Sequence, residues 1–404
     1  MKVIVVGGGM AGASLTLAIS AFSHGKVRVS LIEANSPNEE YHDYDPRTIV
    51  LAYSTCCQFQ KLGIWSGLKK YVTPITYIHV SEYGYASTVN MYAKDYFLPA
   101  FGYVVELHKV KNYLFEQLHN AINIELHCPN EVLSVENTMD QVSVTLTTGK
   151  VLTGQLLVAA DGCNSMIGKA NQVEWHRYAY QQCAIIANVL TSEAPDGRAF
   201  ERFTQNGPLA ILPISRCRSS LVWCHPLEME QHIMQWSNCQ FMEELQKWFG
   251  WRLGEIKDVS ERYSFPLLLS QAKKVISHRL VLIGNAAQTL HPIAGQGFNL
   301  AMRDIINLAH ILSEVGNHAN DIGSYSVLKQ YQMQRNHDRW HTIKFTDNLV
   351  HLFSNNHLLF AIARNIGLMA MEALPMIRDK LARLAMGDCI ISHYLEEKHQ
   401  YGSI

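Results

Sequence analysis

The chain has 404 residues, of which 48% are hydrophobic, and carries a formal net charge of −1 at pH 7. This length and apolar content allow two or three globular domains with substantial cores. A nearly neutral chain has no overall electrostatic attraction for polyanions, so nucleic acid is excluded as an expected partner.

The nine cysteines include no Cys-x-x-Cys pair, which argues against a disulfide framework and against a thiolate metal site. The first six residues lead directly into glycines, without the charged and apolar segments of a secretory signal. No stretch reaches the roughly 20 uninterrupted apolar residues that a membrane-spanning helix requires. A cytoplasmic location is therefore the default expectation.

A glycine-rich turn joins the first predicted strand to the first predicted helix. The strand is a β-branched run at 3–6, and a helical pattern covers 13–21. Between them lie Gly7, Gly8, Gly9, Met10, Ala11 and Gly12. In such a turn the first glycine of the motif permits the tight bend, the second lets the backbone approach a pyrophosphate, and the third allows close packing of helix on strand.

Glu33 completes this motif at the end of a second apolar run, 27–32. It follows Gly12 by 21 residues, the spacing at which a carboxylate accepts hydrogen bonds from ribose hydroxyls. The combination predicts a dinucleotide site but does not distinguish FAD from NAD.

Two further motifs follow predicted strands. The run 151–160 leads into Asp161 and Gly162, an acidic residue and a turn glycine at the carboxyl end of a strand. The run 279–283 leads into Gly284-Asn285-Ala286-Ala287-Gln288, and then into His291-Pro292-Ile293-Ala294-Gly295-Gln296-Gly297-Phe298-Asn299-Leu300. Glycines at 295 and 297 suit the approach of a flat ring, and a helix that begins at about Gln296 presents free N–H groups to negative charge.

Together the three motifs resemble the single-component flavin monooxygenases that are similar to p-hydroxybenzoate hydroxylase. The resemblance implies FAD as the cofactor, with Asp161 near its pyrophosphate and Asn285 on its ribityl chain. Three positions depart from the usual pattern: Gly168 replaces an Arg, Asn285 an Asp and Gln288 a His. The change at 168 weakens the inference on nicotinamide binding, whereas an Asn amide still hydrogen-bonds a hydroxyl.

The resemblance also implies which other residues contact FAD. Arg47, after Pro46, corresponds to an Arg that contacts the cofactor, with a surface salt bridge as its alternative role. Pro292 and Gln296 are placed beside the flavin ring and are the candidate catalytic residues. The full predicted cofactor set is Gly7, Gly9, Met10, Ala11, Gly12, Glu33, Arg47, Asp161, Asn285, Ala286, Gly295, Gln296, Gly297, Phe298 and Asn299.

Further stretches resemble the ubiquinone-biosynthesis branch of these enzymes, and within it the branch that acts on 2-polyprenyl-6-methoxyphenol. They lie at 102–108, 184–189, 199–204, 207–210, 249–254, 291–304 and 345–350. The resemblance implies that NAD(P)H reduces FAD, that oxygen then forms a flavin hydroperoxide, and that the prenylated phenol is hydroxylated to the 1,4-benzoquinol. A different phenol or aromatic acid, and a non-catalytic flavin-binding scaffold in a biosynthetic complex, are the alternatives.

The positions of the motifs predict an α/β fold: a Rossmann-like FAD-binding domain, a mostly antiparallel β-sheet substrate domain and C-terminal helices. The predicted division assigns 1–75, 103–178 and 272–325 to the FAD domain, 76–102 and 179–271 to the substrate domain, and 326–404 to the helical region. No residue identifies itself as the base for the phenol. His291 has two alternatives, a proton relay and a structural histidine.

Two late features have more than one interpretation. The apolar stretch 358–386, with basic residues beside it, is either core or a surface that contacts the inner membrane or a partner of a ubiquinone-biosynthesis complex. His337 and His341 are one helical turn apart, as in some zinc sites, but no third ligand is recognisable, and no metal is expected.

Overall fold

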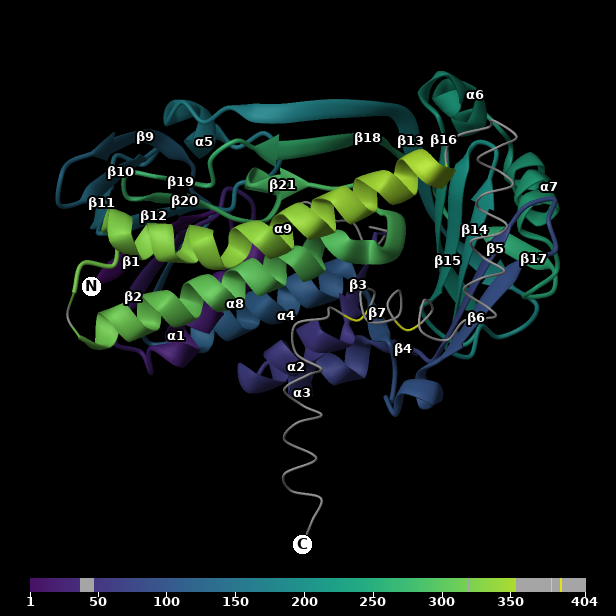
Figure 1. Ribbon diagram of the computed structural model, residues 1–404, viewed down its shortest axis with the longest axis horizontal. Helices are drawn as coiled ribbons and strands as arrows, with labels where there is room; N and C mark the ends of the chain where they lie inside the picture. The colour runs from purple at the N-terminus through teal and green to yellow at the C-terminus, as the bar shows by residue number, and fades with distance from the viewer. Residues whose placement is uncertain (37–46, 319, 354–378, 380–385, 387–404) are drawn as a thin grey trace, which may run out of the picture.

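The computed structural model describes residues 1–36, 47–318, 320–353, 379 and 386 (Figure 1). In that figure a sheet with flanking helices occupies one end of the molecule, and a larger sheet stands at the other end. Two long strands, β13 and β18, run from one end toward the other. No helix among the described residues is long and apolar enough to cross a bilayer.

A six-stranded sheet holds the N-terminal motif. Its order is β19-β20-β12-β1-β2-β8, and all neighbours are parallel except β19 and β20. The strands are β1 (Lys2–Val6), β2 (Arg28–Ile32), β8 (Ile124–His127), β12 (Leu156–Ala159), β19 (Ile276–Ser277) and β20 (Leu280–Leu282). Residues of β1 and β12 are almost continuously apolar and buried, as in a parallel sheet that is covered on both faces.

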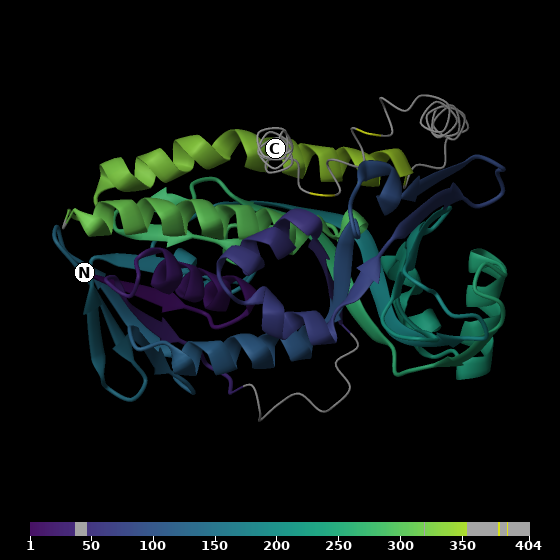
Figure 2. The same ribbon diagram turned by 90° about the horizontal axis from the view of Figure 1, so that it is seen from below.

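Helices and two small sheets surround this central sheet. Figure 2 shows α1 between α8 and α4, with α9 outermost, and the packing of α1 on α8 and α4 agrees with this view. The helices are α1 (Met10–Phe22), α2 (Tyr53–Lys61), α3 (Trp65–Leu68), α4 (Leu107–Asn120), α5 (Met166–Ala170), α8 (Gln296–Asn317) and α9 (Tyr325–Phe353). The small sheets are β3 (Thr48–Ala52), β7 (Gly102–Glu106) and β4 (Thr73–Ile75), and β11 (Val151–Gly154), β10 (Val142–Leu146) and β9 (Val132–Asn137).

A nine-stranded sheet forms the other end of the molecule. Its path is β21-β18-β13-β16-β15-β14-β5-β6, with β17 paired to β13, and only the β14–β5 pair is parallel. The elements are β5 (Tyr77–Glu82), β6 (Thr88–Tyr92), β13 (Trp175–Thr191), β14 (Arg198–Thr204), β15 (Gly207–Pro213), β16 (Arg218–Pro226), β17 (Ile256–Val259), β18 (Tyr263–Ala272) and β21 (Gln288–Thr289), with α6 (Glu230–Met234) and α7 (Asn238–Phe249) packed on one face.

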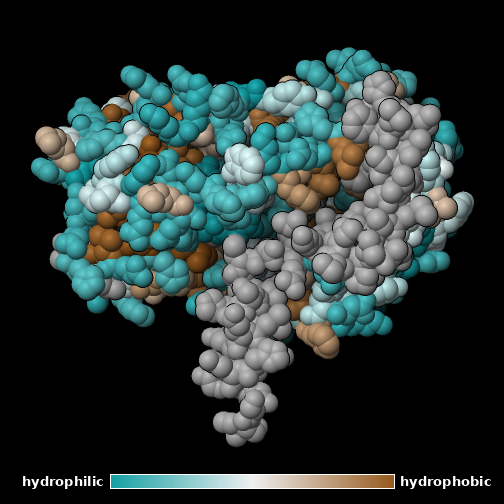
Figure 3. Space-filling view, in the orientation of Figure 1, coloured by the Kyte–Doolittle hydropathy of each residue, from teal (hydrophilic) through white to brown (hydrophobic). Residues whose placement is uncertain are grey.

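The two faces of this sheet have different surroundings. Alternate residues such as Ile185, Ile211 and Trp223 pack with Phe241 and Leu245 of α7 in one buried cluster. The side chains between them point to the opposite face, toward the six-stranded sheet and its helices. Figure 3 shows that hydrophilic side chains cover most of one face of the molecule, with apolar side chains visible in patches.

The predicted fold class is confirmed, including the mostly antiparallel second sheet and the helix after residue 325. The domain division stays a prediction. β13 begins at Trp175 and β18 ends at Ala272, so each strand crosses one of the predicted boundaries as a single element. The apolar stretch 358–386 lies outside the described residues except for Asp379 and Met386, of which Met386 is buried.

A buried polar network joins α8, α9 and β21. Asp304 is fully buried and accepts hydrogen bonds from Arg335 Nε at 2.7 Å and from Gln288 Nε2 at 3.0 Å. Arg339 donates to the Gln288 amide oxygen, and Arg335 also bonds Asp338. Gln288, which replaces the usual His of the third motif, therefore has two buried partners.

The Arg339 guanidinium also lies 3.8 Å from the Asp304 carboxylate. We expect Asp304→Ala to lower the free energy of unfolding by about 3–5 kcal/mol, because the buried guanidinium groups of Arg335 and Arg339 lose their shared carboxylate. Equilibrium denaturation measures this loss. The matched control is Glu244→Ala, which breaks an exposed ion pair with Lys247 and should leave the transition unchanged within error. Equal stability of the Asp304 variant and the control would contradict the importance of the network.

Candidate functional site

The glycines of the first motif serve two different purposes, the fold of the turn and space for a ligand. Gly7 has a φ of +99°, and a Cβ there would lie 2.4 Å from the Ala160 carbonyl oxygen. A Cβ on Gly12 would lie 1.8 Å from the Gly7 oxygen. A Cβ on Gly9 would meet no atom of the described part of the chain within 4 Å. Gly7 and Gly12 are thus required by the fold, whereas the space beside Gly9 is open to a ligand at the start of α1.

Glu33 contacts the same turn. Its carboxylate accepts hydrogen bonds from the Gly8 N–H and, at 3.0 Å, from the Asn35 N–H. These bonds hold the carboxylate against the glycine-rich turn. Met10 and Ala11 are half-buried at the start of α1, where no side chain caps the helix. The predicted roles of the three residues toward ribose and pyrophosphate are compatible with these positions and stay predictions.

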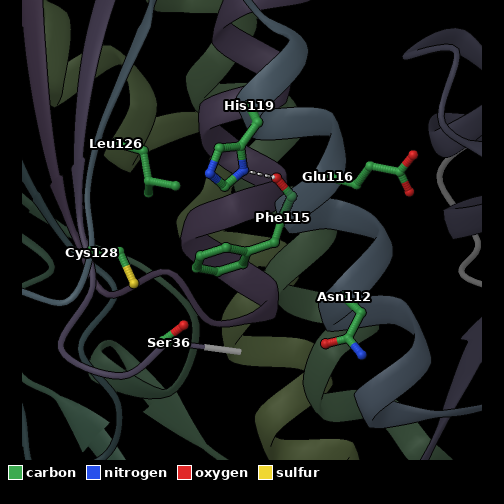
Figure 4. A pocket seen from close by; sticks show the side chains of 7 residues that line it. All are labelled: Ser36, Asn112, Phe115, Glu116, His119, Leu126 and Cys128. Carbon is green, nitrogen blue, oxygen red and sulfur yellow. Dashed lines mark hydrogen bonds between the residues drawn. The ribbon is translucent and has the colours of Figure 1, made fainter. Parts of the chain in front are cut away.

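A pocket with a volume of about 360 Å³ lies between α4 and the end of β8. Figure 4 shows its lining from α4, from β8 and from the segment after β2, with the Phe115 ring, Leu126 and Cys128 around it. Ser36, three residues after Glu33, lies at its edge.

Asp161 follows β12 and begins the second motif. Its Oδ2 accepts a hydrogen bond from the Ile167 N–H at 3.1 Å, while its buried Oδ1 has no hydrogen-bond partner among the described residues. Gly162 has a φ of +85°, and a Cβ there would meet nothing within 4 Å. An orphaned carboxylate oxygen next to an open glycine fits a site that is completed by a polar ligand.

The structure explains why Gly168 replaces the Arg of the wider family. A Cβ at Gly168 would lie 2.6 Å from the indole ring of Trp175. The Trp175 Nε1 donates to the Ala286 carbonyl oxygen at 2.9 Å. The indole therefore occupies the place of the larger side chain and links the second motif to the third. Sequence reasoning missed this role of Trp175.

The third motif packs against the first. Gly284 has a φ of +57°, and a Cβ there would lie 2.8 Å from the Ala11 Cβ. Asn285, next in the chain, is exposed, and Ala286 is buried. The exposed amide leaves Asn285 available to a ligand, as its predicted role requires. The structure thus brings the three motifs together around the Gly7–Gly12 turn.

The α8 loop, which we define as residues 290–295, leads into α8 in the predicted manner, because α8 begins at Gln296. Pro292 is exposed and Gln296 is buried. The Phe298 ring packs at a tilt of 31° on Phe59, with 6.2 Å between ring centroids. Among the described residues, a Cβ on Gly297 would meet nothing within 4 Å. Gly297 therefore leaves open space for a flat ring, and Pro292 lies at the surface of the loop.

Two residues of the predicted cofactor set in this segment also have a role in the fold. Gly295 has a φ of +60°, and a Cβ there would lie 3.1 Å from the Val50 Cβ, so the glycine is needed for the turn and for packing. The Asn299 amide accepts from Ala52 N–H and Thr55 Oγ1 and donates to the oxygens of Val50 and Gly295. These four bonds use the hydrogen-bonding capacity of the amide, so the side chain positions the α8 loop. The predicted cofactor contacts of Gly295 and Asn299 stay predictions.

Arg47 lies between the two halves of the molecule. Its guanidinium carbon is 5.8 Å from the centroid of the Phe265 ring on β18. Beside it, Thr48 Oγ1 donates to Ser220 Oγ of β16 at 2.8 Å. The start of β3 therefore contacts the nine-stranded sheet, and Arg47 sits where a cofactor and a substrate held by the two halves would meet.

His291 and Tyr180 lie where the α8 loop contacts this sheet. The His291 ring is buried, and its Nδ1 accepts a hydrogen bond from the Ile293 N–H at 3.2 Å. Burial lowers the pKa of His291 to about 4, so the ring is neutral at pH 7. Tyr180 stacks edgewise on it and donates to Asp347 of α9 at 2.8 Å. This geometry favours the structural interpretation of His291.

The face of the nine-stranded sheet that looks toward the α8 loop is mostly apolar. Phe203 packs with Ile293 of the loop and with Val350 of α9. Val80, Ala210 and Val222 lie on the same face, since the strand register places them in one row across β5, β15 and β16. Glu201 of β14 belongs to this row. Its acidic side chain on an apolar face was a signal that sequence reasoning missed.

His337 and His341 lie on the exposed side of α9, with 3.0 Å between their Nε2 atoms. Asp338, between them in the sequence, is bound to Arg303 and Arg335. In the part of the chain that the structure describes, no group of three or more His, Cys, Asp or Glu side chains is placed to hold a metal ion.

The two classes of glycine give a direct test of the cradle. We expect Gly9→Ala to fold normally but to weaken FAD binding by roughly 100-fold, about 2.7 kcal/mol, because its methyl group enters the open space beside the turn. Gly12→Ala should instead lower the yield of folded protein, since its methyl group meets the Gly7 oxygen. FAD titration and thermal unfolding separate the two effects. Unchanged FAD affinity in Gly9→Ala would contradict the assignment.

Burial of His291 predicts a pH-dependent stability. The unfolded imidazole gains a proton as the pH falls through about 6.5, but the folded one gains it only near pH 4. The contribution of neutral His291 is therefore full above pH 6.5 and is lost between pH 6.5 and 4, by about 3 kcal/mol. Denaturation of wild type and His291→Asn across this window measures it. Parallel stability curves for the two proteins would refute the prediction.

The comparisons with known proteins agree with this geometry. The model of the FAD binding domain family matches residues 1–346. The chain is 32% identical over 386 residues to ubiquinone hydroxylase UbiL of Rhodospirillum rubrum, covering 95% of this chain and 89% of the relative. It is 29% identical over 389 residues to 3-demethoxyubiquinol 3-hydroxylase of Escherichia coli, covering 96% and 98%.

Solved structures share the fold. The chain resembles p-nitrophenol 4-monooxygenase PnpA from Pseudomonas putida with a TM-score of 0.77 and 17% identity, over 96% of this chain and 98% of that one. It resembles Klebsiella pneumoniae HpxO in complex with FAD and uric acid with a TM-score of 0.75 and 16% identity, over 96% and 97%. At these identities the likeness shows the fold alone.

Proposed function

We propose that this protein hydroxylates the aromatic ring of a prenylated phenol in ubiquinone biosynthesis. The premise is that the chain belongs to the FAD binding domain family and is an FAD-dependent monooxygenase. The proposed reaction converts a 2-polyprenyl-6-methoxyphenol to the corresponding 1,4-benzoquinol. The observation that carries the proposal is the apolar sheet face opposite the α8 loop. The relatives are named as hydroxylases of ubiquinone and 3-demethoxyubiquinol, which supports a quinone precursor as substrate.

The described residues fit FAD at the three motifs. The backbone N–H groups of the turn at Gly9 would hold the pyrophosphate, with Asp161 nearby to accept a hydrogen bond from a polar group of the ligand. Glu33 would hold the ribose and Asn285 the ribityl chain. When bound, FAD supplies oxygen transfer from O2, with NAD(P)H as the transient electron donor. The open side of Gly297 provides space for the flat end of the cofactor.

The protein's own part in this reaction is to hold the ring and to exclude water. Phe203, Ala210 and Val222 offer an apolar wall to an aromatic ring and its prenyl chain. The same wall removes water from the reacting atoms, which protects reactive oxygen chemistry from hydrolysis. Arg47 at the margin and Pro292 on the α8 loop remain candidates for contact with the cofactor ring.

The scaffold alternative is wrong, because the chain belongs to a family of enzymes. Packing of Trp175 on Gly168 also accounts for the departure that suggested it. A different aromatic substrate remains the competing proposal, and the apolar wall favours the prenylated one. Contact with the inner membrane or with a biosynthetic complex stays a proposal, and the stretch 358–386 that suggested it lies outside the described residues except at Asp379 and Met386.

A turnover assay with product identification tests the proposed function. The FAD-loaded protein is incubated with NADH or NADPH, oxygen and 2-prenyl-6-methoxyphenol, and the product is analysed by mass spectrometry and NMR. We expect one added oxygen atom at the ring carbon para to the phenolic oxygen. The control substrate is an unprenylated hydroxybenzoic acid. Hydroxylation of the acid alone, or at another ring carbon, would contradict the proposal.

A further inference from the structure

Glu201 lies on the sheet face that looks toward the α8 loop. Along β14 the side chains of Ala199, Glu201 and Phe203 share one face, since strand residues alternate. Ala199 packs in an apolar cluster with Val104 of β7, and Phe203 packs with Ile293 of the α8 loop. Glu201 lies between these two clusters and faces the same side.

The Glu201 carboxylate has apolar neighbours in its own row, Val80 on β5 and Ala210 on β15. The adjacent Arg202 does not neutralise it. The Arg202 guanidinium points to the opposite face, where it donates to the Trp248 oxygen at 2.7 Å and to Ser81 Oγ at 3.1 Å. Among the residues that the structure describes, no hydrogen bond or ion pair reaches the Glu201 carboxylate.

A buried carboxylate without a counter-ion is costly, and folds rarely retain one without a function. Burial raises the pKa of Glu201 to about 7. As a whole residue Glu201 is half-buried, and the strand alternation places its side chain on the face that looks toward the α8 loop. The group is thus basic enough to take a proton near neutral pH.

The other titratable groups on this side are less suitable as a base. Burial raises the pKa of Cys224, so this residue stays a neutral thiol. Burial and the bond to Asp347 raise the pKa of Tyr180 well above its ordinary value, so Tyr180 stays neutral. Burial lowers the pKa of His291 to about 4, which makes its ring a weaker base than Glu201.

Charged groups at the margins of this face already have partners. Glu82, at the end of β5, and Arg47 each have an interaction partner. Asp347 accepts the Tyr180 hydroxyl. Glu106 is paired with Lys109 and with Arg218, which lies beyond Ser220 on β16. Glu201 therefore differs from each of these groups in having no partner among the described residues.

We infer that Glu201 is the catalytic base that accepts the phenolic proton of the substrate. The inference rests on the proposed function, since it requires a phenol on this face. In the step, the O–H bond of the phenol breaks and a new O–H bond forms on a Glu201 carboxylate oxygen. The electron pair stays on the phenolic oxygen, and the phenolate enriches the ring carbons ortho and para to it. The product regains a proton from Glu201.

Glu201→Gln tests this role, because the amide still accepts a hydrogen bond but cannot take the proton. We expect kcat at pH 7 to fall by roughly 100-fold, while KM for 2-prenyl-6-methoxyphenol changes by less than about 3-fold. Glu201→Asp should recover part of the rate. Glu255→Gln, an exposed carboxylate bound to Lys257, is the matched control and should match wild type.

The pH profile separates a base from a merely structural residue. Wild-type kcat/KM should fall as the pH drops below about 7, because Glu201 becomes protonated. In Glu201→Gln the fall in kcat/KM around pH 7 should disappear. The rate of this variant should instead rise with pH up to the pKa of the phenol itself, because only the ionised phenol then reacts. A nitro-substituted phenol, already ionised at pH 7, should reduce the defect to less than about 10-fold.

An infrared titration of the FAD-loaded protein, without reductant, tests the group independently of turnover. The protonated-carboxyl band that is lost in Glu201→Gln should titrate near pH 7 and shift when 2-prenyl-6-methoxyphenol binds. An inactive wild-type enzyme with all phenols would refute the proposed function. Any of three results would overturn the Glu201 assignment alone. They are a wild-type kcat in Glu201→Gln, an equal defect of this variant with the ionised phenol, and an infrared band that does not shift when the phenol binds.

Discussion

The antiparallel pairing of β13 with β18 is the constraint on which the rest of the structure depends. β13 pairs with β18 from Trp175 to Ile186, and its second half also pairs with β16. β18 in turn pairs with β21, the strand that follows Asn285. One continuous set of hydrogen bonds thus joins the cofactor motifs to the substrate-facing sheet (Figure 1). The distance between the three motifs and the nine-stranded sheet is therefore fixed by backbone pairing.

Buried polar groups hold the helical side of the same arrangement. Asp304 links α8 to α9 through Arg335 and links both to β21 through Gln288. Asn299 ties the first turn of α8 to β3 and α2. These bonds fix the α8 loop, and neither Gly297 nor the Asn285 side chain takes part in them. Both therefore stay open to a ligand. An FAD-dependent monooxygenase benefits from such a preorganised site, because reacting groups must be held close together.

Local patterns predicted the cofactor half well. The strand, glycine turn and helix at 3–21 are neighbours in the chain, so the spacing of residues reports their geometry directly. The structural roles of Gly295 and Asn299 were not predicted, because their partners Val50, Ala52 and Thr55 lie about 250 residues away in the sequence. The face that Glu201 occupies likewise depends on pairing with β5 and β15. Contacts between distant segments are invisible to periodicity.

The structure of the FAD-loaded protein with 2-prenyl-6-methoxyphenol bound tests the central claim most directly. The claim is that the sheet face around Phe203 and Glu201 holds the substrate ring against the α8 loop. We predict that the phenolic oxygen lies within hydrogen-bonding distance of a Glu201 carboxylate oxygen, with the ring between β14 and Gly297. A ring bound elsewhere, such as in the pocket between α4 and β8 (Figure 4), would contradict the account.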